Sequence, residues 1–282
     1  MKNYGLNIYK EIAEQSREDH VYGGLSQPCI TNIEPEEREK YLPAGELQNI
    51  GEEKMDCASR SPINILETKF NWLLRNKKIS PENEKWLNDN GYIENNSCLF
   101  SDAFVAIKSG TTREGNSLKA TLHAIYSQGL VPKKLLPQLD SFEEHHNPER
   151  ITESIKQLGL DFLERFPMEY EKVYTIHSEE LLKEDMLDVA GFAWSQPENG
   201  IYPRIDNSPN HAFMVFGFPK YKIFDNYVDS FDGDFIKQLA PDYNLLDYGY
   251  RIKIIKEIIP AKSSGFSELF KSYLKVLKRL FS

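Results

Sequence analysis

The sequence has few cysteines, and they form no recognisable framework. Its 282 residues include Cys29, Cys57 and Cys98, at unrelated spacings and without a Cys-x-x-Cys pair. An odd, scattered set of cysteines argues against a disulfide framework or a zinc site and fits a reducing compartment. The N-terminus lacks the apolar segment of a secretory signal. We therefore expect a cytoplasmic protein, with association to a virion as an alternative, and we expect no metal or other cofactor.

Long apolar runs and an excess of positive charge are also missing. No apolar run approaches the roughly 20 residues that would span a bilayer. The formal net charge is −9, whereas general binding to nucleic acid needs clustered Lys and Arg. With 40% hydrophobic and 27% charged residues, the composition is that of an ordinary globular protein. The sequence therefore points away from a membrane span and from a nucleic-acid partner.

The two halves of the chain differ in their patterns. Apolar residues at helical spacing and serine or glycine caps predict helices over 57–74, 80–91 and 117–129. One more helix is predicted near 148–165. After it, short β-branched and aromatic runs bounded by Gly, Pro, Asn and Asp predict strands. A helical half followed by a strand half is typical of an α+β fold with two lobes.

These patterns divide the chain into three parts. Residues 1–40 are a polar, turn-rich leader with room for one short helix. Residues 41–258 hold both lobes, the helical one at about 57–140 and the β lobe at about 165–258. Residues 263–282 form a separate C-terminal tail.

The tail is predicted to be an amphipathic basic helix. Apolar residues recur from Phe266 to Phe281 at helical spacing, with Lys and Arg between them. Such a helix can dock on its own domain, associate with a second copy or another partner, or lie on a membrane surface. The flexible spacer before it favours self-association or another partner.

One cysteine lies where a helix is predicted to begin. Free backbone N–H groups and the helix dipole favour an anion at Cys57 and so would lower its pKa. A nucleophilic thiol also needs a base and a group that orients the base. His211 starts an alternating strand, and Asn226 follows the next one. If 211–218 and 221–225 pair as a hairpin, residues 211 and 226 lie at the same end of the ladder and their side chains can meet.

Each of these residues also has a simpler explanation. A lone buried cysteine is more often structural than reactive, and a strand histidine is more often a core residue than a base. An asparagine after a strand is usually a turn residue. The three together, in this order and on these elements, are much less expected by chance. The pattern therefore favours a catalytic set of Cys57, His211 and Asn226.

The same residues lie within a longer resemblance, from about residue 40 to residue 258. The segments "YLPAGELQN", "MDCAS", "GNSLKATLHAIYSQGLVP", "NHAFMVFGF" and "IFDNY" follow one another along the chain. In these segments the sequence resembles the papain-like cysteine peptidases. The resemblance implies a two-lobed fold, with a helical lobe and a β-barrel-like lobe, and a thiol protease activity on a polypeptide substrate. It implies Cys57 as nucleophile, His211 as base and Asn226 as the residue that orients His211.

The resemblance also implies residues that bind the reacting groups. Gln48 is implied as a donor to the oxyanion, together with the backbone N–H of Cys57, although it lies nine residues before the cysteine, further than is usual. Gly115 and Asn116 correspond to the glycine-rich wall that holds an extended substrate, with a simple loop as the alternative. Tyr227 stands where the family has a shielding tryptophan.

Three departures from the family pattern surround the thiol. Asp56 brings a carboxylate beside Cys57 and would raise the pKa of the thiol if it pointed at the sulfur. Ala58 replaces a tryptophan. Pro62 lies early in the helix and can kink it if the helix begins at Cys57.

The expected function is hydrolysis of peptide or isopeptide bonds through a thioester acyl-enzyme. One rival is acyl transfer by an amidase or a transglutaminase-like enzyme, which Asp225 beside Asn226 keeps open. A second rival is a non-catalytic structural module, of the kind found in virions, with the same fold. The intact Cys, His and Asn set speaks against that second rival, because a scaffold has no need of all three.

Overall fold

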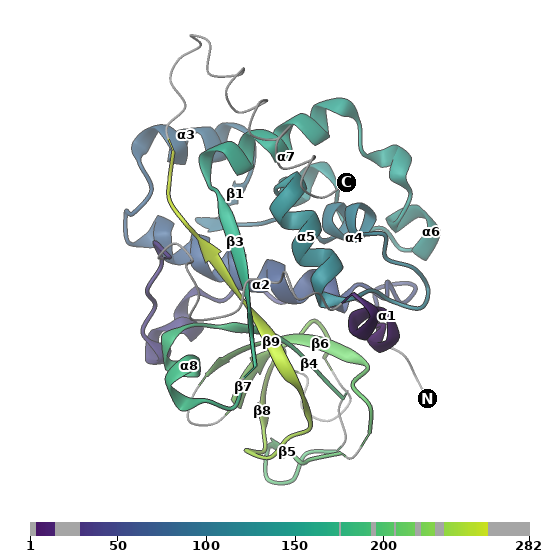
Figure 1. The fold of residues 1–282 in the computed structure, drawn as a ribbon. Helices are drawn as coiled ribbons and strands as arrows, with labels where there is room; N and C mark the ends of the chain where they lie inside the picture. The colour runs from purple at the N-terminus through teal and green to yellow at the C-terminus, as the bar shows by residue number, and fades with distance from the viewer. Residues whose placement is uncertain are drawn as a thin grey trace.

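The computed structural model describes residues 4–14, 29–174, 176–192, 196–205, 207–217, 221–228 and 234–258. Figure 1 shows most of the helices packed on one side of a large sheet, with α8 (Glu179–Glu184) apart from them beside the sheet. The long strand β9 (Leu245–Ile254) reaches into the helical part. The predicted tail helix, Phe266–Phe281, lies outside the described residues. None of the described helices is both long and apolar enough to cross a membrane.

The helical part follows the predicted pattern closely, because side chains cap most of its helices. The hydroxyl groups of Ser80, Ser117 and Thr152 each accept a hydrogen bond from a backbone N–H of the first helical turn. The helices are α1 (Ile8–Ala13), α2 (Cys57–Arg75), α3 (Pro81–Asp89), α4 (Asp102–Ser109), α5 (Leu118–Gln128), α6 (Phe142–His145), α7 (Glu153–Arg165) and α8 (Glu179–Glu184). Three short 3-10 helices join them: η1 (Pro35–Tyr41), η2 (Lys133–Leu135) and η3 (Pro148–Arg150).

Helix α2 is the central element and is buried along nearly its whole length. It packs against strand β6 (His211–Gly217), and its residues Ile63, Leu66 and Phe70 lie in the larger hydrophobic core. Pro62 has no N–H and cannot donate to the carbonyl of Ala58, four residues earlier. The hydroxyl of Thr121 on α5 donates to that carbonyl instead, at 2.8 Å. The helix therefore runs as one element from Cys57 through Pro62.

Seven strands form one open sheet in the order β3-β9-β4-β6-β7-β8-β5. Their bounds are β3 (Met168–Val173), β4 (Leu187–Gly191), β5 (Ile201–Tyr202), β6 (His211–Gly217), β7 (Tyr221–Phe224), β8 (Ile236–Leu239) and β9 (Leu245–Ile254), and a separate pair joins β1 (Ile93–Glu94) to β2 (Ser97–Cys98). The α+β class is as predicted. The prediction of a barrel-like lobe needs correction. The described strands leave β3 and β5 as the two edges of the sheet, so they close no barrel.

The predicted hairpin is present, and its register decides which side chains share a face. Strands β6 and β7 are antiparallel, with Met214 opposite Phe224 and Val215 opposite Ile223. Continuing this register places position 225 opposite 213, on the same face as 211, and position 226 opposite 212, on the other face. Residues 211 and 225 therefore lie on one face of the hairpin.

The N-terminal leader packs against both parts of the molecule. Figure 1 places α1 beside α5, at the boundary between the helices and the sheet. Further along, η1 carries Arg38, which is 1% exposed. Its guanidinium donates to the backbone carbonyls of Ile33, Leu182, Lys183, Asp185 and Phe216. The leader is thus anchored to the sheet by buried polar contacts.

Candidate active site

Cys57 lies at the first position of α2, as the sequence predicts, but it is only 1% exposed. The backbone N–H of Ala212, the residue that follows His211, lies near enough to act on the thiol, and by itself it would lower the pKa of Cys57. Burial raises the pKa of the Cys57 thiol well above its ordinary value, and the nearby carboxylates of Asp56, Glu53 and Asp225 raise it further. These effects outweigh the N–H of Ala212, so the expected lowering of the pKa by the helix start is wrong for this arrangement.

The carboxylate of Asp56 is turned to other partners. It accepts from Arg60 Nε at 2.8 Å and lies 3.2 Å from His145 Nε2, and all three side chains are fully buried. Burial by itself would raise the pKa of Asp56, but Arg60 and His145 outweigh it and hold that pKa well below its usual range. Asp56 therefore anchors the start of α2 through its contacts with Arg60 and His145.

His211, the first residue of β6, is fully buried and faces a carboxylate. Its Nε2 lies 2.7 Å from Asp225 Oδ1. Asp225 also lies 3.6 Å from the ammonium of Lys237, which compensates part of its charge. The ring of Tyr227 stands edge-on to the imidazole, with centroids 5.2 Å apart. With Nε2 directed at Asp225, Nδ1 is the ring nitrogen through which His211 can exchange a proton.

Asn226, predicted to orient His211, makes different contacts. Its carboxamide oxygen accepts from Asn64 of α2 at 2.7 Å, and its Nδ2 donates to the carbonyl of Glu46 at 3.0 Å. Its own carbonyl accepts from the backbone N–H of Gln48 at 3.0 Å. The contact with His211 belongs to Asp225 instead, because the hairpin register puts 226 on the opposite face.

Gln48 is fully buried and is held by a residue that the sequence analysis did not single out. Its Nε2 donates to Glu53 Oε1 at 2.6 Å and to the backbone carbonyl of Tyr4 at 3.0 Å. Glu53 also accepts from the backbone N–H of Met55 and from the Tyr227 hydroxyl. Glu53 thus links Gln48, the predicted oxyanion donor, to Tyr227, whose ring lies beside His211. No motif pointed to Glu53, since its role depends on where the loop before α2 folds.

No family model and no curated protein matches the sequence. Solved structures do match the fold. Xylellain, a cysteine protease from Xylella fastidiosa, aligns over 90% of this chain and 96% of its own, with a TM-score of 0.56 and 14% identity. A ragweed pollen cysteine protease, Amb a 11 in its proform, aligns over 93% of this chain and 71% of its own, at 0.54 and 12%. The clostridial cysteine protease Cwp84 aligns over 82% and 59%, at 0.52 and 11%.

The fold is that of the papain-like cysteine proteases. The resemblance found in the sequence is therefore confirmed for the fold. At these identities, what the site does has to be argued from its own residues. In this papain-like fold Cys57 begins the central helix and His211 begins the strand that packs against it.

The predicted substrate wall of this papain-like fold lies on the loop before α5. Gly115 has a φ of +86° and closes a turn with Thr112, and a Cβ there would meet the carbonyl oxygen of Gly5 at 2.2 Å. The Asn116 carboxamide bonds to Ser109, Thr111 and the Ser117 N–H, which fixes the loop. The backbone N–H of Asn116 donates to the Gly5 carbonyl at 2.9 Å, and its carbonyl accepts from the Asn7 N–H at 2.8 Å.

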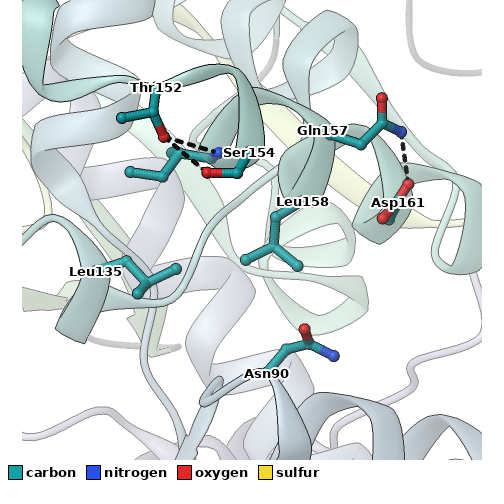
Figure 2. A pocket seen from close by; sticks show the side chains of 8 residues that line it. Asn90, Leu135, Thr152, Ser154, Gln157, Leu158 and Asp161 are labelled. Carbon is teal, nitrogen blue, oxygen red and sulfur yellow. Dashed lines mark hydrogen bonds between the residues drawn. The ribbon is translucent and has the colours of Figure 1, made fainter.

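A separate surface hollow of about 510 Å³ lies between α3, η2 and α7. Figure 2 shows four of its polar side chains bonded in pairs, with Gln157 donating to Asp161 at 2.7 Å and Thr152 Oγ1 lying 2.9 Å from Ser154 Oγ. None of the residues that line it belongs to the candidate active site.

The described part of the chain contains no group of three or more His, Cys, Asp or Glu residues arranged to hold a metal ion.

Proposed function

We propose that the protein is a cysteine peptidase that hydrolyses peptide or isopeptide bonds, with Cys57 as nucleophile, His211 as base and Asp225 as the residue that orients His211. The observation that carries the proposal is the 2.7 Å contact between His211 Nε2 and Asp225 Oδ1. His211 begins β6, the strand that packs against the helix begun by Cys57. In this arrangement Cys57 is the nucleophile, His211 is its base and Asp225 orients the base, which are the three parts that nucleophilic catalysis requires.

In the proposed reaction, His211 Nδ1 accepts the thiol proton and the Cys57 sulfur attacks the substrate carbonyl carbon. Gln48 Nε2 and the backbone N–H of Cys57 stabilise the negative oxygen of the tetrahedral intermediate. The imidazolium then gives its proton to the leaving amine, which leaves a thioester on Cys57. His211 next removes a proton from water, and the resulting hydroxide releases the acyl group and restores the thiol.

Acyl transfer to an amine is the second candidate. It is favoured by the residue that orients the base. In this chain that residue is a carboxylate, Asp225, whereas the papain-like peptidases carry an amide in that position. Both reactions pass through the same thioester and differ only in whether water or an amine takes the acyl group. Product analysis with and without an added primary amine separates them, because transfer yields a new amide in proportion to the amine.

Labelling with an electrophilic peptide tests the proposal. An epoxysuccinyl peptide is expected to add one equivalent to the protein, and peptide mapping by mass spectrometry is expected to find it on Cys57. The half-buried Cys29 is the internal control, because it lies against Thr31 and Lys69 and contacts no histidine among the residues that the structure describes. Exclusive addition to Cys29, or no addition after prolonged incubation, would support the non-catalytic structural module instead.

Gln48→Ala is expected to lower kcat by roughly a hundredfold to a thousandfold, since one oxyanion donor is lost. KM is expected to change little, because the donor acts mainly on the charged intermediate. Steady-state kinetics on a fluorogenic peptide measures both parameters. Gln138→Ala is a suitable control, since Gln138 donates to the Leu47 carbonyl in the same region but contacts Arg60 rather than the site. An unchanged kcat in Gln48→Ala would assign the donor role to another group.

A further inference from the structure

Strand β8 carries a lysine among apolar residues. Lys237 lies opposite Ile223 of β7, and Leu239, two positions further on, lies opposite Tyr221. Residues two apart share a face of a strand, and Ile223, Tyr221 and Leu239 all belong to the smaller hydrophobic core. Lys237 is itself only 1% exposed. An ammonium in such surroundings is unfavourable unless it is paired, so its partners indicate what it does there.

The ammonium of Lys237 lies at the second oxygen of the carboxylate that contacts His211. Its Nζ is 3.6 Å from Asp225 Oδ2, whereas Asp225 Oδ1 is 2.7 Å from His211 Nε2. All three side chains are buried, with at most 1% of each exposed. The carboxylate of Asp225 therefore stands between an imidazole and a cation.

Two backbone carbonyls fix the ammonium in this place. Lys237 Nζ donates to the carbonyl of Tyr227 at 2.6 Å and to that of Asp234 at 2.8 Å. Tyr227 follows β7 and Asp234 precedes β8, and the ring of Tyr227 stands edge-on to the His211 imidazole. One side chain thus holds the backbone of the residue that packs on His211 and faces the carboxylate that orients His211.

The charge of Lys237 opposes the charge of Asp225. A carboxylate beside an imidazole favours the imidazolium, in which both ring nitrogens are donors and neither can accept a proton. A cation on the far side of the carboxylate offsets part of that effect, and salt screens buried charges only weakly. Lys237 therefore favours the neutral imidazole, which is the form that a base must have.

Other titratable groups face the same site from several segments of the chain. Those that face Asp225, His211 or Cys57 come from the N-terminal segment, from the residues before α2 and from the segments that follow β7 and β8: Tyr4, Glu53, Asp56, Tyr227 and Tyr243. Two of these groups are carboxyls and three are phenols. Lys237 supplies the charge opposite to that of the carboxylates.

We propose that Lys237 is a positioning residue for the base: it holds Asp225 against His211 and offsets the carboxylate charge, so that the imidazole is neutral when it must take the thiol proton. The inference rests on the proposed function for its consequence, since a neutral imidazole matters only if His211 acts as a base. A single lysine between apolar strand residues looks exposed in the sequence, and only the fold places it behind Asp225.

Lys237→Met tests the charge, because methionine is similar in length and has no ammonium. We expect the imidazolium of His211 to persist to higher pH in this variant. The acid limb of the kcat/KM profile, where activity rises with pH, is therefore expected to move up by about one pH unit. At a pH on that limb kcat/KM is expected to fall about tenfold, whereas the plateau at higher pH is largely kept. Lys237→Arg keeps the charge and is expected to restore the limb to its original position.

Lys253→Met is the matched control, since it removes another buried ammonium from the same sheet. Lys253 lies on β9, is 5% exposed and donates to Glu171 at 2.8 Å. Both Met variants are expected to melt at a lower temperature, because each removes a cation from a buried carboxylate. Only Lys237→Met is expected to move the acid limb. Equal losses of activity at every pH in Lys237→Met would make Lys237 a structural support and overturn the proposal.

Proton NMR of the histidines follows the imidazole directly and needs no turnover, so it separates the two proposals. The midpoint of the His211 Cε1–H titration, assigned with His211→Gln, is expected to rise by about one pH unit in Lys237→Met. A rise without hydrolysis in any of the proteins would refute the proposed function and keep the effect of Lys237 on His211. Hydrolysis with an unmoved midpoint and an unmoved limb would refute the role of Lys237 and keep the function.

Lys237→Gln keeps the proposal testable if Lys237→Met does not fold. Its amide can still donate to a backbone carbonyl, but it carries no charge. The same upward movement of the midpoint and of the limb is expected. An unchanged midpoint in a folded Lys237→Gln protein would show that the hydrogen bonds of Lys237 matter and its charge does not, which overturns the proposal.

Discussion

Cys57→Ala is expected to abolish peptide hydrolysis, and His211→Ala to come close to doing so. Removal of a nucleophile or its base in a comparable serine enzyme costs roughly a millionfold in kcat, because no other group forms the acyl-enzyme. Neither residue is the main support of the fold, so both variants are expected to unfold cooperatively near the melting temperature of the unmodified protein. A fluorogenic peptide assay together with thermal melting measures the two properties.

Cys29→Ala is the matched control for Cys57→Ala, since it removes the same atom from a half-buried site away from His211. It is expected to retain full activity. Full activity in His211→Ala would move the base to His123, His145, His146 or His177. Of these, His145 is bonded to Asp56 and His177 to Tyr221, and neither lies on β6, the strand that packs against the helix of Cys57.

The second large effect is expected at Asp225 and not at Asn226. Asp225→Ala removes the group that fixes the imidazole, so we expect kcat to fall by about a hundredfold, at the low end of what positioned acid–base catalysis contributes. Asn226→Ala is expected to leave kcat within about threefold, because its amide bonds to Asn64 and Glu46. Steady-state kinetics gives the comparison, with KM unchanged in both variants.

Asp225→Asn distinguishes positioning from a general loss of structure. Its amide oxygen can still accept from His211 Nε2–H, so this variant is expected to recover most of the activity that Asp225→Ala loses. Asp225→Ala also leaves the buried ammonium of Lys237 without that carboxylate, which is expected to lower the melting temperature. A larger loss in Asn226→Ala than in Asp225→Ala would restore Asn226 to the orienting role.

The sequence alone determined the elements that carry the site. Cys57 begins α2, α3 starts where its serine cap predicts, α5 ends at the predicted Gly129, and the alternating run from His211 forms β6. Local patterns suffice for these features, because capping and side-chain periodicity depend on residues a few positions apart. The same patterns carried the family resemblance, which the fold confirms.

The partner of His211 could not be chosen from the strand pattern alone. Asp225 and Asn226 are neighbours, and successive side chains point to opposite faces of a strand. A one-residue change in register exchanges them, and only the pairing of Met214 with Phe224 shows that 225 shares a face with 211. The β lobe was likewise predicted as barrel-like, while strand order, a property of long-range pairing, leaves the sheet open.

Only the tertiary structure decided the state of the thiol. The helix start predicts a lowered pKa for Cys57, but burial raises it, and burial depends on everything packed around the sulfur. Ala212 and Asp225, two of the groups that act on that pKa, lie more than 150 positions from Cys57 in the sequence. Helix starts and strand faces are local properties, whereas desolvation arises when distant segments meet.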